Sequence, residues 1–155
     1  MMAGAMSEEL TILPADRQSR AHVVRLLGRQ FAELEIPAPL ERLARAADGV
    51  FDDNSRGAFL LALLGERVVG LAYLSYQWTL EHGGKIAWLE ELFIEPDVRS
   101  RGFGERLLET ALEHARAAGC RAVDLEVEDG HPRAANLYQR AGFVPLERSR
   151  FYRLL

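Results

Sequence analysis

Hydrophobic residues recur along this chain with two different periods, which together predict an alternation of helices and strands. Between Asp16 and Pro37, apolar residues return every three or four positions, the spacing of an amphipathic helix, and Asp16 is suited to cap its start. Residues 103–118 show the same spacing, and Gly119 is placed to end that helix. Residues 122–127 instead alternate apolar and polar side chains, which predicts a half-buried strand.

The other segments are assigned by the same patterns. The expected strands cover residues 9–13, 57–64, 67–78, 87–94, 122–127 and one or two stretches within 143–154, and the remaining helices cover 40–47 and 134–140. Gly65 and Glu66 separate two of these strands by a hairpin turn. The order β-α-α-β-β-β-α-β-α-β predicts an α/β (α+β) fold, a mixed sheet with helices on both faces.

Composition narrows the class of protein. The chain has 155 residues, of which 48% are hydrophobic and 27% charged, so we expect one globular domain over residues 8–155 after a flexible tail over residues 1–7. The longest apolar run, residues 58–64, is too short to span a membrane, which favours a soluble, cytoplasmic protein. A single cysteine excludes an internal disulfide framework, and a net charge of -4 gives no reason to expect a nucleic-acid partner.

Residues 94–105 carry the clearest chemical signal, because two glycines stand where a strand leads into a helix. The first turn of a helix has amide groups without internal partners, so an anion placed there gains hydrogen bonds. Gly102 and Gly104 remove side chains that would keep a phosphate away from the backbone, and Arg99 and Arg101 add positive charge. The pattern lacks the lysine of a Walker loop and the third glycine of a dinucleotide fingerprint. Taken alone, it equally fits a plain turn.

The flanking motifs decide between these readings. The pattern R-x-x-G-x-G at 99–104 follows L-F-I-x-P at 92–96 and precedes N-L-Y-x-x-x-G-F at 136–143. These motifs, in this order and at this separation, resemble the GNAT superfamily of acetyl-CoA-dependent N-acetyltransferases. The resemblance covers residues 57–143 well.

The resemblance implies a mostly antiparallel sheet whose fourth and fifth strands splay apart, with the pantetheine arm of acetyl-CoA between them and its pyrophosphate on residues 99–104. The family often has asparagine seven residues before the tyrosine, whereas this chain has His131. The residues then expected to contact acetyl-CoA are Leu92, Phe93, Ile94, Arg99, Ser100, Arg101, Gly102, Phe103, Gly104, His131, Ala134 and Asn136.

Two neighbouring acids, Glu90 and Glu91, interrupt an apolar strand and are candidate catalytic bases. Consecutive residues of a regular strand point to opposite faces, so at least one carboxylate should line a cleft. A structural ion pair with an arginine is the alternative. The L-E-E-L-F run at 89–93 resembles the Leu-Glu-acid-aromatic run of the polyamine-acetylating branch of the family, and that register favours Glu90.

By the resemblance, Tyr138 stands where the family usually has its general acid. A phenol suits this role, because it stays protonated at neutral pH and can donate to a departing thiolate. Packing of a core tyrosine is the alternative. A backbone N–H near Leu92 or Phe93 can stabilise the oxyanion. Cys120 has no histidine nearby in sequence, so we expect a small buried hydrophobe and direct acetyl transfer. The four histidines lack metal-ligand spacing, and no metal is expected.

These features predict an N-acetyltransferase that acts on a primary amine, the acceptor being a small cationic molecule. A protein or peptide N-acetyltransferase and a non-catalytic acyl-CoA-binding module are the alternatives. Acids that would attract a cation to the acceptor side are Glu33, Glu35, Glu41, Asp48, Asp52 and Asp53, with Glu81 and Glu90 nearby, although arginines interleaved among them also fit a solvated mixed surface. Residues 151–155 are mostly apolar, and many members of the family that this chain resembles form dimers, so we expect a homodimer.

Overall fold

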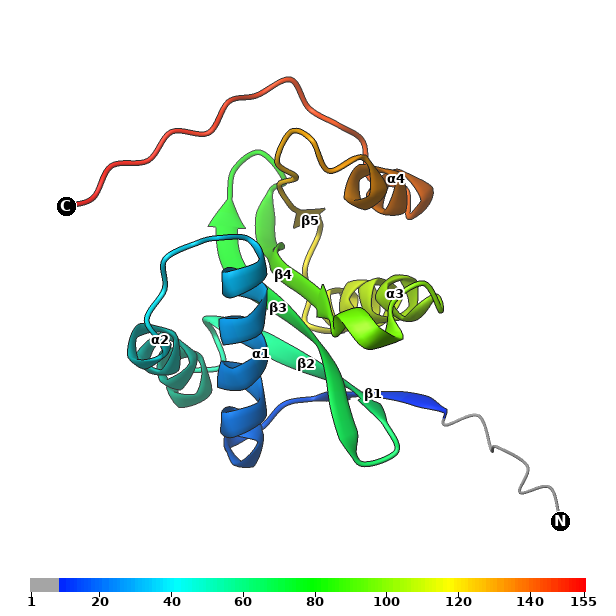
Figure 1. The fold of residues 1–155 in the computed structure, drawn as a ribbon. Helices are drawn as coiled ribbons and strands as arrows, with labels where there is room; N and C mark the ends of the chain where they lie inside the picture. Colours follow the sequence, from blue (N-terminus) through cyan, green and yellow to red (C-terminus); the bar gives the residue numbers. More distant parts are fainter. Residues whose placement is uncertain (1–8) are drawn as a thin grey trace, which may run out of the picture.

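The computed structural model describes residues 9–155 and arranges them around one five-stranded sheet (Figure 1). The expected tail over residues 1–7 lies outside the described residues. The strands are β1 (Leu10–Pro14), β2 (Gly57–Leu64), β3 (Arg67–Thr79), β4 (Gly84–Ile94) and β5 (Val123–Asp124). The helices are α1 (Arg20–Glu33), α2 (Leu40–Asp52), α3 (Phe103–Ala117) and α4 (Pro132–Arg140), with two short 3-10 turns at Arg17–Ser19 and Pro96–Val98.

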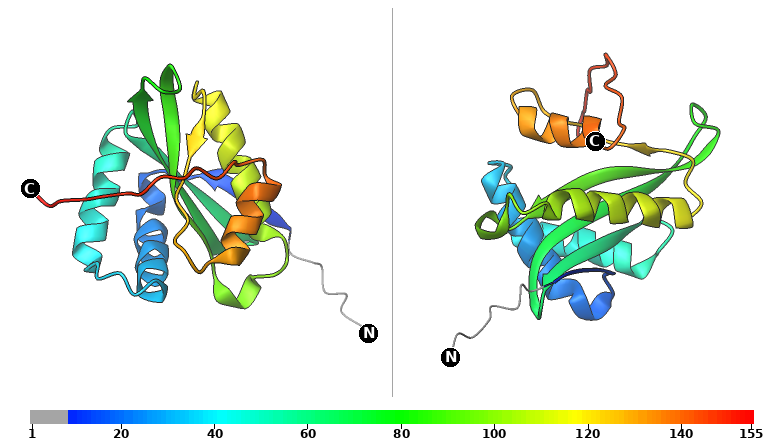
Figure 2. Two further views of the ribbon diagram at one scale, coloured as in Figure 1. Left: turned by 90° about the horizontal axis from the view of Figure 1, so that it is seen from above. Right: turned by 90° about the vertical axis from the view of Figure 1, so that its right-hand side faces the viewer.

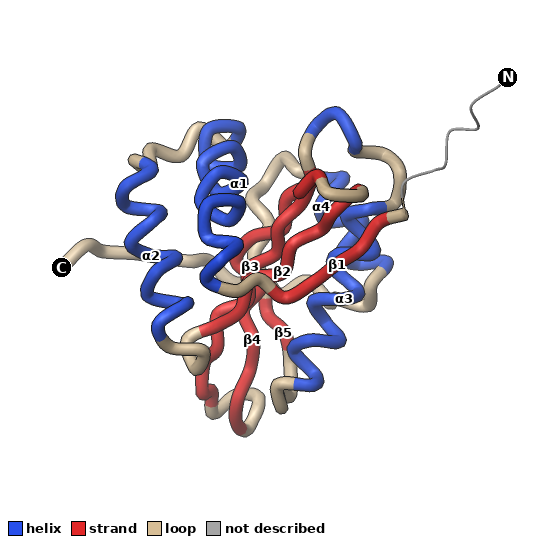
Figure 3. The backbone as a smooth tube through the Cα atoms, turned by 90° about the horizontal axis from the view of Figure 1, so that it is seen from below, coloured by secondary structure: helices blue, strands red, loops and turns tan. Residues whose placement is uncertain are grey.

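The sheet is mixed, as the sequence predicts. Strands β1 to β4 pair in chain order and antiparallel, whereas β5 lies parallel to β4. Helices α1 and α2 cover one face, and α3 and α4 lie against the other (Figure 3). None of the helices in residues 9–155 is long and apolar enough to cross a membrane.

Strand alternation explains how one sheet serves two separate cores. On β2, Leu60 and Ala62 pack with the buried face of α3, while Phe59 and Leu61 pack with α1 and α2. Because successive side chains point to opposite faces, an apolar strand such as β2 contributes to both cores at once. Burial on both faces therefore explains the nearly continuous apolar run of this segment.

Strands β4 and β5 touch over two residue pairs only, Ala87 with Val123 and Trp88 with Asp124. Beyond Trp88 the two strands separate, which agrees with the splayed fourth and fifth strands implied by the resemblance. The predicted strand over 122–127 was therefore too long, because its last residues have no partner in β4 with which to form a ladder.

Two other expectations need correction. The second helix runs to Asp52 rather than residue 47, because Val50 and Phe51 extend its apolar face onto the core. The strands predicted within 143–154 are absent: these residues form neither helix nor strand, and they run across the end of the sheet (Figure 1). A strand needs a neighbouring strand to hydrogen-bond, and this segment lies along none in the described chain.

Candidate active site

The site is organised by a one-residue shift of register between β3 and β4. Tyr73 pairs with Glu91 and Leu74 pairs with Leu89, so Glu90 is an extra residue without a cross-strand partner. Such a β-bulge sets two residues of one strand against one residue of its neighbour. Glu90 points away from the face of Leu89 and Leu74, and Glu91 shares the face of Tyr73. Both carboxylates therefore lie on the same face of the sheet.

A hydrogen bond supports this placement. The Ser75 hydroxyl donates to Oε1 of Glu90 across 2.7 Å, and Ser75 shares the Tyr73 face because Leu74 stands between them. The expectation that neighbouring strand residues point to opposite faces is thus wrong at this position, because the bulge interrupts the alternation. Tyr73 packs against the core beneath α1 and α2, which identifies the face. Within residues 9–155, neither carboxylate forms a direct salt bridge with an arginine.

The titratable groups around the bulge influence one another. Burial, and then the charge of Glu90, raise the pKa of Glu91 to about 7. Burial and the two carboxylates raise the pKa of Tyr73 to about 12. The pKa of Tyr138 on α4 is also raised, first by burial and then by Glu91. Glu91 therefore lies within electrostatic reach of the predicted acid, although the two come from different elements.

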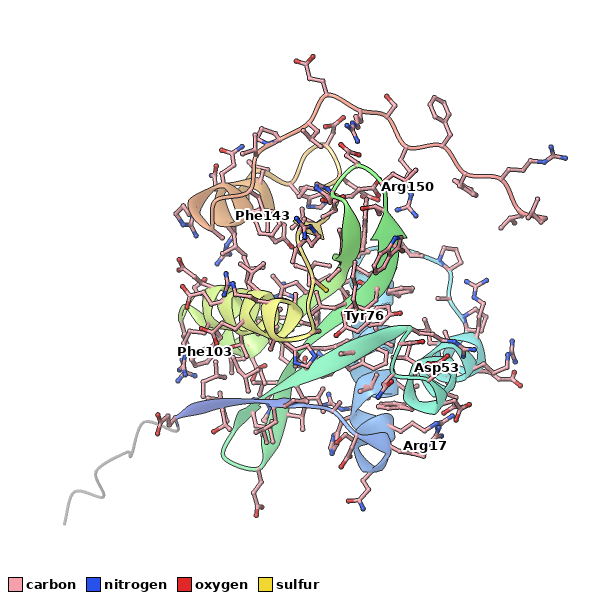
Figure 4. All side chains as sticks on the ribbon, turned by 180° about the vertical axis from the view of Figure 1, so that it is seen from behind. Arg17, Asp53, Tyr76, Phe103, Phe143 and Arg150 are labelled. Carbon is pink, nitrogen blue, oxygen red and sulfur yellow. The ribbon has the colours of Figure 1, made fainter. Side chains whose placement is uncertain are left out.

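A groove of about 1370 Å³ lies where β4 and β5 part, and α4 closes one side of it. Glu90 and Tyr138 both line it, as does His131 at the start of α4. The Tyr138 ring lies edge-on to Phe143, with ring centres 5.8 Å apart (Figure 4 labels Phe143). The groove thus brings the predicted acid and one predicted base to the same space.

Cys120 also lines the groove. Burial raises the pKa of its thiol, an effect that outweighs the opposing influence of Lys85. Since the thiolate is the reactive form, this position favours the unreactive thiol. Among residues 9–155, no group of three or more histidine, cysteine, aspartate and glutamate side chains is arranged to hold a metal ion.

The turn before α3 has the geometry of an anion cradle. Ser100 and Gly102 both adopt positive φ angles, 64° and 79°, and Gly102 is the residue that precedes the helix. In the described chain no side chain caps the first turn of α3, and nothing lies within 4 Å of the position a Cβ on Gly102 would take. The unbonded amides of this turn therefore open onto free space, which fits a pyrophosphate.

Arginines reach this turn from two directions. The Arg101 guanidinium lies over the Phe103 ring, 4.7 Å from its centre (Figure 4 labels Phe103), and Arg133 of α4 donates to the Ser100 hydroxyl across 2.9 Å. The contact of Arg133 was missed by the sequence reasoning. It joins residues 33 positions apart, and nothing in the local pattern indicates it.

Arg99, expected to bind the pyrophosphate, has protein partners in this structure. Its guanidinium donates to Glu33 of α1 across 2.8 Å and to the Ile94 carbonyl across 2.8 Å. Arg25 and Arg29, on the same helix, bind the buried carboxylate of Glu95 at 2.8 and 3.0 Å. Helix α1 thus anchors the segment that leads from β4 to the cradle. The spacing of residues 25, 29 and 33, four apart on a predicted helix, is the signal that could have revealed this polar stripe.

The other predicted contact residues fall into two groups. Leu92, Phe93 and Ile94 form the end of β4, with Phe93 and Ile94 buried on opposite faces of the sheet. On α4, Ala134 is half-buried and Asn136 is exposed. The groove does not include any of these positions, nor residues 99–104, so the cradle and the groove are neighbouring but separate parts of the site.

Most acids expected on the acceptor side are bound to arginines. The pairs are Asp48 with Arg20, Asp52 with Arg17, Asp53 with Arg56, Glu41 with Arg45, Glu33 with Arg99 and Glu81 with Arg148. Figure 4 labels Arg17 and Asp53 on this side of the molecule. This arrangement agrees with the alternative of a mixed, solvated surface. The two β4 carboxylates are therefore the stronger candidates for attracting a cation.

The raised pKa of Glu91 predicts a dependence of stability on pH. Below about pH 4.5 this carboxyl is protonated in both states, but between 4.5 and 7 the unfolded chain loses the proton while the folded chain keeps it. Its contribution to stability is thus lost as pH rises through that window, by up to about 3 kcal/mol. Glu91→Gln removes this loss. Urea unfolding should show that the free energy of unfolding of the variant, relative to that of the wild type, is higher at pH 8 than at pH 4.

Glu66, an exposed acid in the turn between β2 and β3, supplies the control. Glu66→Gln should change the stability difference between the two pH values very little. If Glu91→Gln and Glu66→Gln behave alike, the carboxyl of Glu91 does not have the raised pKa described above.

Comparison with known proteins agrees with the fold described above. The profile of the acetyltransferase (GNAT) family matches residues 22–143. The mycothiol acetyltransferase of Corynebacterium glutamicum is 32% identical over 106 residues, which cover 68% of this chain and 34% of that protein. The chain thus spans about a third of the length of that relative. The thialysine N-epsilon-acetyltransferase of Mus musculus is 30% identical over 131 residues, covering 77% of this chain and 74% of that protein.

A solved structure shows the same fold. The aminoglycoside N-acetyltransferase AAC(6')-Iy in complex with CoA superposes with a TM-score of 0.82 over 94% of this chain and 95% of its own, at 19% identity. The splayed strands and the helices on both faces are thus those of a known fold. Because the family profile matches most of this chain, the chain belongs to the acetyltransferase (GNAT) family.

Proposed function

We propose that this chain transfers an acetyl group from acetyl-CoA to a primary amine of a small molecule. The observation that carries the proposal is the bulge in β4, which sets Glu90 and Glu91 on one face beside the groove that also holds Tyr138. Such an arrangement supplies a base and an acid at the point where two strands part. Its chemistry is that required for aminolysis of a thioester.

The base has to remove a proton from an alkyl ammonium, whose pKa is about 10.4 in water. We assign this role to Glu90, because its carboxylate is exposed in the groove and the Ser75 hydroxyl fixes its orientation. The proton moves directly or through one water. Glu91, half-buried beside it, is the second candidate, since a group with a pKa of about 7 is well matched to proton transfer near neutral pH.

Tyr138 is proposed as the acid. Burial raises the pKa of its phenol, so the phenol stays protonated at neutral pH. The amine nitrogen bonds to the carbonyl carbon of the thioester as the C–S bond breaks, and the phenol gives its proton to the departing sulfur. The amine nitrogen then loses a second proton, which replaces the one given by the phenol. The products are the N-acetyl amine and free CoA.

Acetyl-CoA fits the residues around the cradle. The amides at the start of α3, the side chains of Ser100 and Arg101, and Arg133 from α4 surround the open space beside Gly102. The end of β4, residues 92–94, offers backbone groups where the strand has left β5. Bound there, acetyl-CoA supplies the activated acetyl group.

We propose a small cationic amine as acceptor. Glu90 and Glu91 place negative charge on the acceptor face, and the chain as a whole carries a net charge of -4. Two of the proteins compared above, named for thialysine and aminoglycosides, are named for amines. We also propose that the protein is a homodimer.

Gly104 gives the first test of the cofactor site. Gly104→Ala should raise the free energy of unfolding by about 0.5–1 kcal/mol, because alanine is the better helix former and, among residues 9–155, the nearest atom outside the helix to a Cβ at this position belongs to Ile94, at 4.0 Å. The same methyl group crowds the amides of the first turn, so affinity for CoA should fall. Calorimetric titration with CoA and urea unfolding measure the two effects. A stabilised variant with unchanged CoA affinity would contradict the proposed cradle.

Tyr138 and Cys120 test the mechanism together. Tyr138→Phe should reduce kcat roughly 10²–10⁴-fold, the usual loss when an acid catalyst is removed. Cys120→Ala should keep most of the activity, because the acetyl group passes directly to the amine. Release of free thiol from acetyl-CoA, followed with a panel of amines, aminoglycosides and peptides, gives both numbers. An inactive Cys120→Ala enzyme, or ping-pong kinetics, would require an acetyl-cysteine step instead.

The charge of the acceptor can be tested with a linear diamine and an amino alcohol of the same length. At low salt kcat/KM should favour the diamine several-fold, and the preference should fade as salt screens the carboxylates beyond about 8 Å. Glu91→Gln should weaken the preference, with Glu66→Gln as the matched control. Equal values for both amines at low salt would contradict the proposed preference for an acceptor that carries a second positive charge.

A further inference from the structure

Three charged side chains of α1, spaced four residues apart, bind the segment between β4 and α3. Arg25 and Arg29 bind the buried carboxylate of Glu95, and Glu33 binds Arg99. Figure 2 shows the end of α1 beside this segment in both views. The contact of Glu33 differs from the other two, because Arg99 is also a residue of the proposed pyrophosphate site.

The nitrogens of Arg99 are already in use on the side of α1. A paired contact with a phosphate uses two neighbouring nitrogens of a guanidinium group. Nε of Arg99 donates to the Ile94 carbonyl across 2.8 Å, so Nη1 and Nη2 are the pair left for a phosphate. Nη2, however, donates to Oε2 of Glu33 across 2.8 Å. A pyrophosphate on the cradle and the Glu33 carboxylate therefore compete for the same nitrogen.

The two contacts of α1 with this segment differ in burial. The side chains of Arg99 and Glu33 are 34% and 44% exposed, and ion pairs exposed to this extent contribute little free energy. The side chain of Glu95 is 3% exposed and binds two guanidinium groups, so breaking that contact would leave a buried charge without a partner. Helix α1 can therefore keep its place through Glu95 while Glu33 and Arg99 separate.

We propose that the pyrophosphate of acetyl-CoA displaces Glu33 from Arg99, and that the carboxylate released in this way helps to bind a cationic acceptor. Glu33 is thus a positioning residue for Arg99 in the free protein. Helix α1 covers the face of the sheet that carries Glu90 and Glu91, so a released Glu33 carboxylate adds negative charge on that side. This inference rests on the proposed function, both on the cofactor cradle and on the cationic acceptor.

Such an exchange couples the two substrates. A cation that binds Glu33 weakens the contact of this carboxylate with Arg99, which makes the guanidinium available to the pyrophosphate. The coupling is reciprocal, so CoA and a diamine each raise the affinity for the other by the same factor. A factor of a few is the size that a partly exposed ion pair allows.

Calorimetric titration with CoA tests the competition. Glu33→Gln should lower the Kd for CoA about two- to fivefold, because Arg99 then has no competing anion. The control is Glu109→Gln, which removes an exposed carboxylate from the second turn of α3, the helix that begins at the cradle, and should change the Kd far less. When Arg99 is already replaced, in the variant Arg99→Gln, adding Glu33→Gln should have no further effect.

The possible failures are distinguishable. CoA that does not bind the wild type contradicts the proposed function itself. If Arg99→Gln leaves the Kd unchanged, Arg99 is not part of the cradle and the exchange is wrong. If Arg99→Gln weakens CoA binding but Glu33→Gln does not strengthen it, or strengthens it equally without Arg99, the cradle stands and the exchange is overturned.

A second titration with CoA, at saturating concentration of a linear diamine, tests the coupling. The diamine should lower the Kd for CoA several-fold in the wild type and in Glu109→Gln, and this effect should be lost in Glu33→Gln. A diamine effect of equal size in the wild type and in Glu33→Gln would mean that the cation does not bind the released carboxylate, and would reject the role of Glu33 in the acceptor site.

Discussion

The extra residue at Glu90 is the constraint on which the proposed site depends. In a regular strand Glu90 and Glu91 would lie on opposite faces, and the carboxylate on the wrong face would enter the core beneath α3 and α4. The bulge brings both to the face of Tyr73, where burial and the charge of Glu90 raise the pKa of Glu91. A bulge also bends its strand. In this chain β4 and β5 part immediately before it, after Trp88, and the groove opens there.

The cradle depends on the same strand through a different set of contacts. Only a short segment separates the bulge from the first turn of α3, and α1 holds that segment through Glu95 and Arg99. Removing a buried carboxylate such as Glu95 would leave two guanidinium groups without their partner. The segment between the carboxylates and the proposed anion site is therefore held by ion pairs with a helix that contributes no predicted catalytic group.

Local patterns predicted those parts of the fold that local forces determine. The helix after Gly102, the β2–β3 hairpin and the end of α4 at Arg140 were placed within a few residues, because periodicity and glycine conformations act over short distances. The bulge was not predicted, because the sequence of an apolar strand with two neighbouring acids is compatible with both a regular and a bulged strand. The partners of Arg99 and Arg133 lie 66 and 33 residues away, and pairing over such separations leaves no local trace. The strands predicted within 143–154 are absent for a similar reason: the local sequence does not show whether a neighbouring strand is available to hydrogen-bond with them.

The central claim is that the bulge makes Glu90 and Glu91 an interacting pair on one face of β4. Carbon-13 NMR of the two side-chain carboxyl carbons, followed from pH 3 to pH 9, tests this directly, with Glu90→Gln used to assign the signals. The account predicts that Glu91 titrates near pH 7 and that its midpoint falls when Glu90 loses its charge. A Glu91 titration near pH 4.5, unchanged by Glu90→Gln, would contradict it.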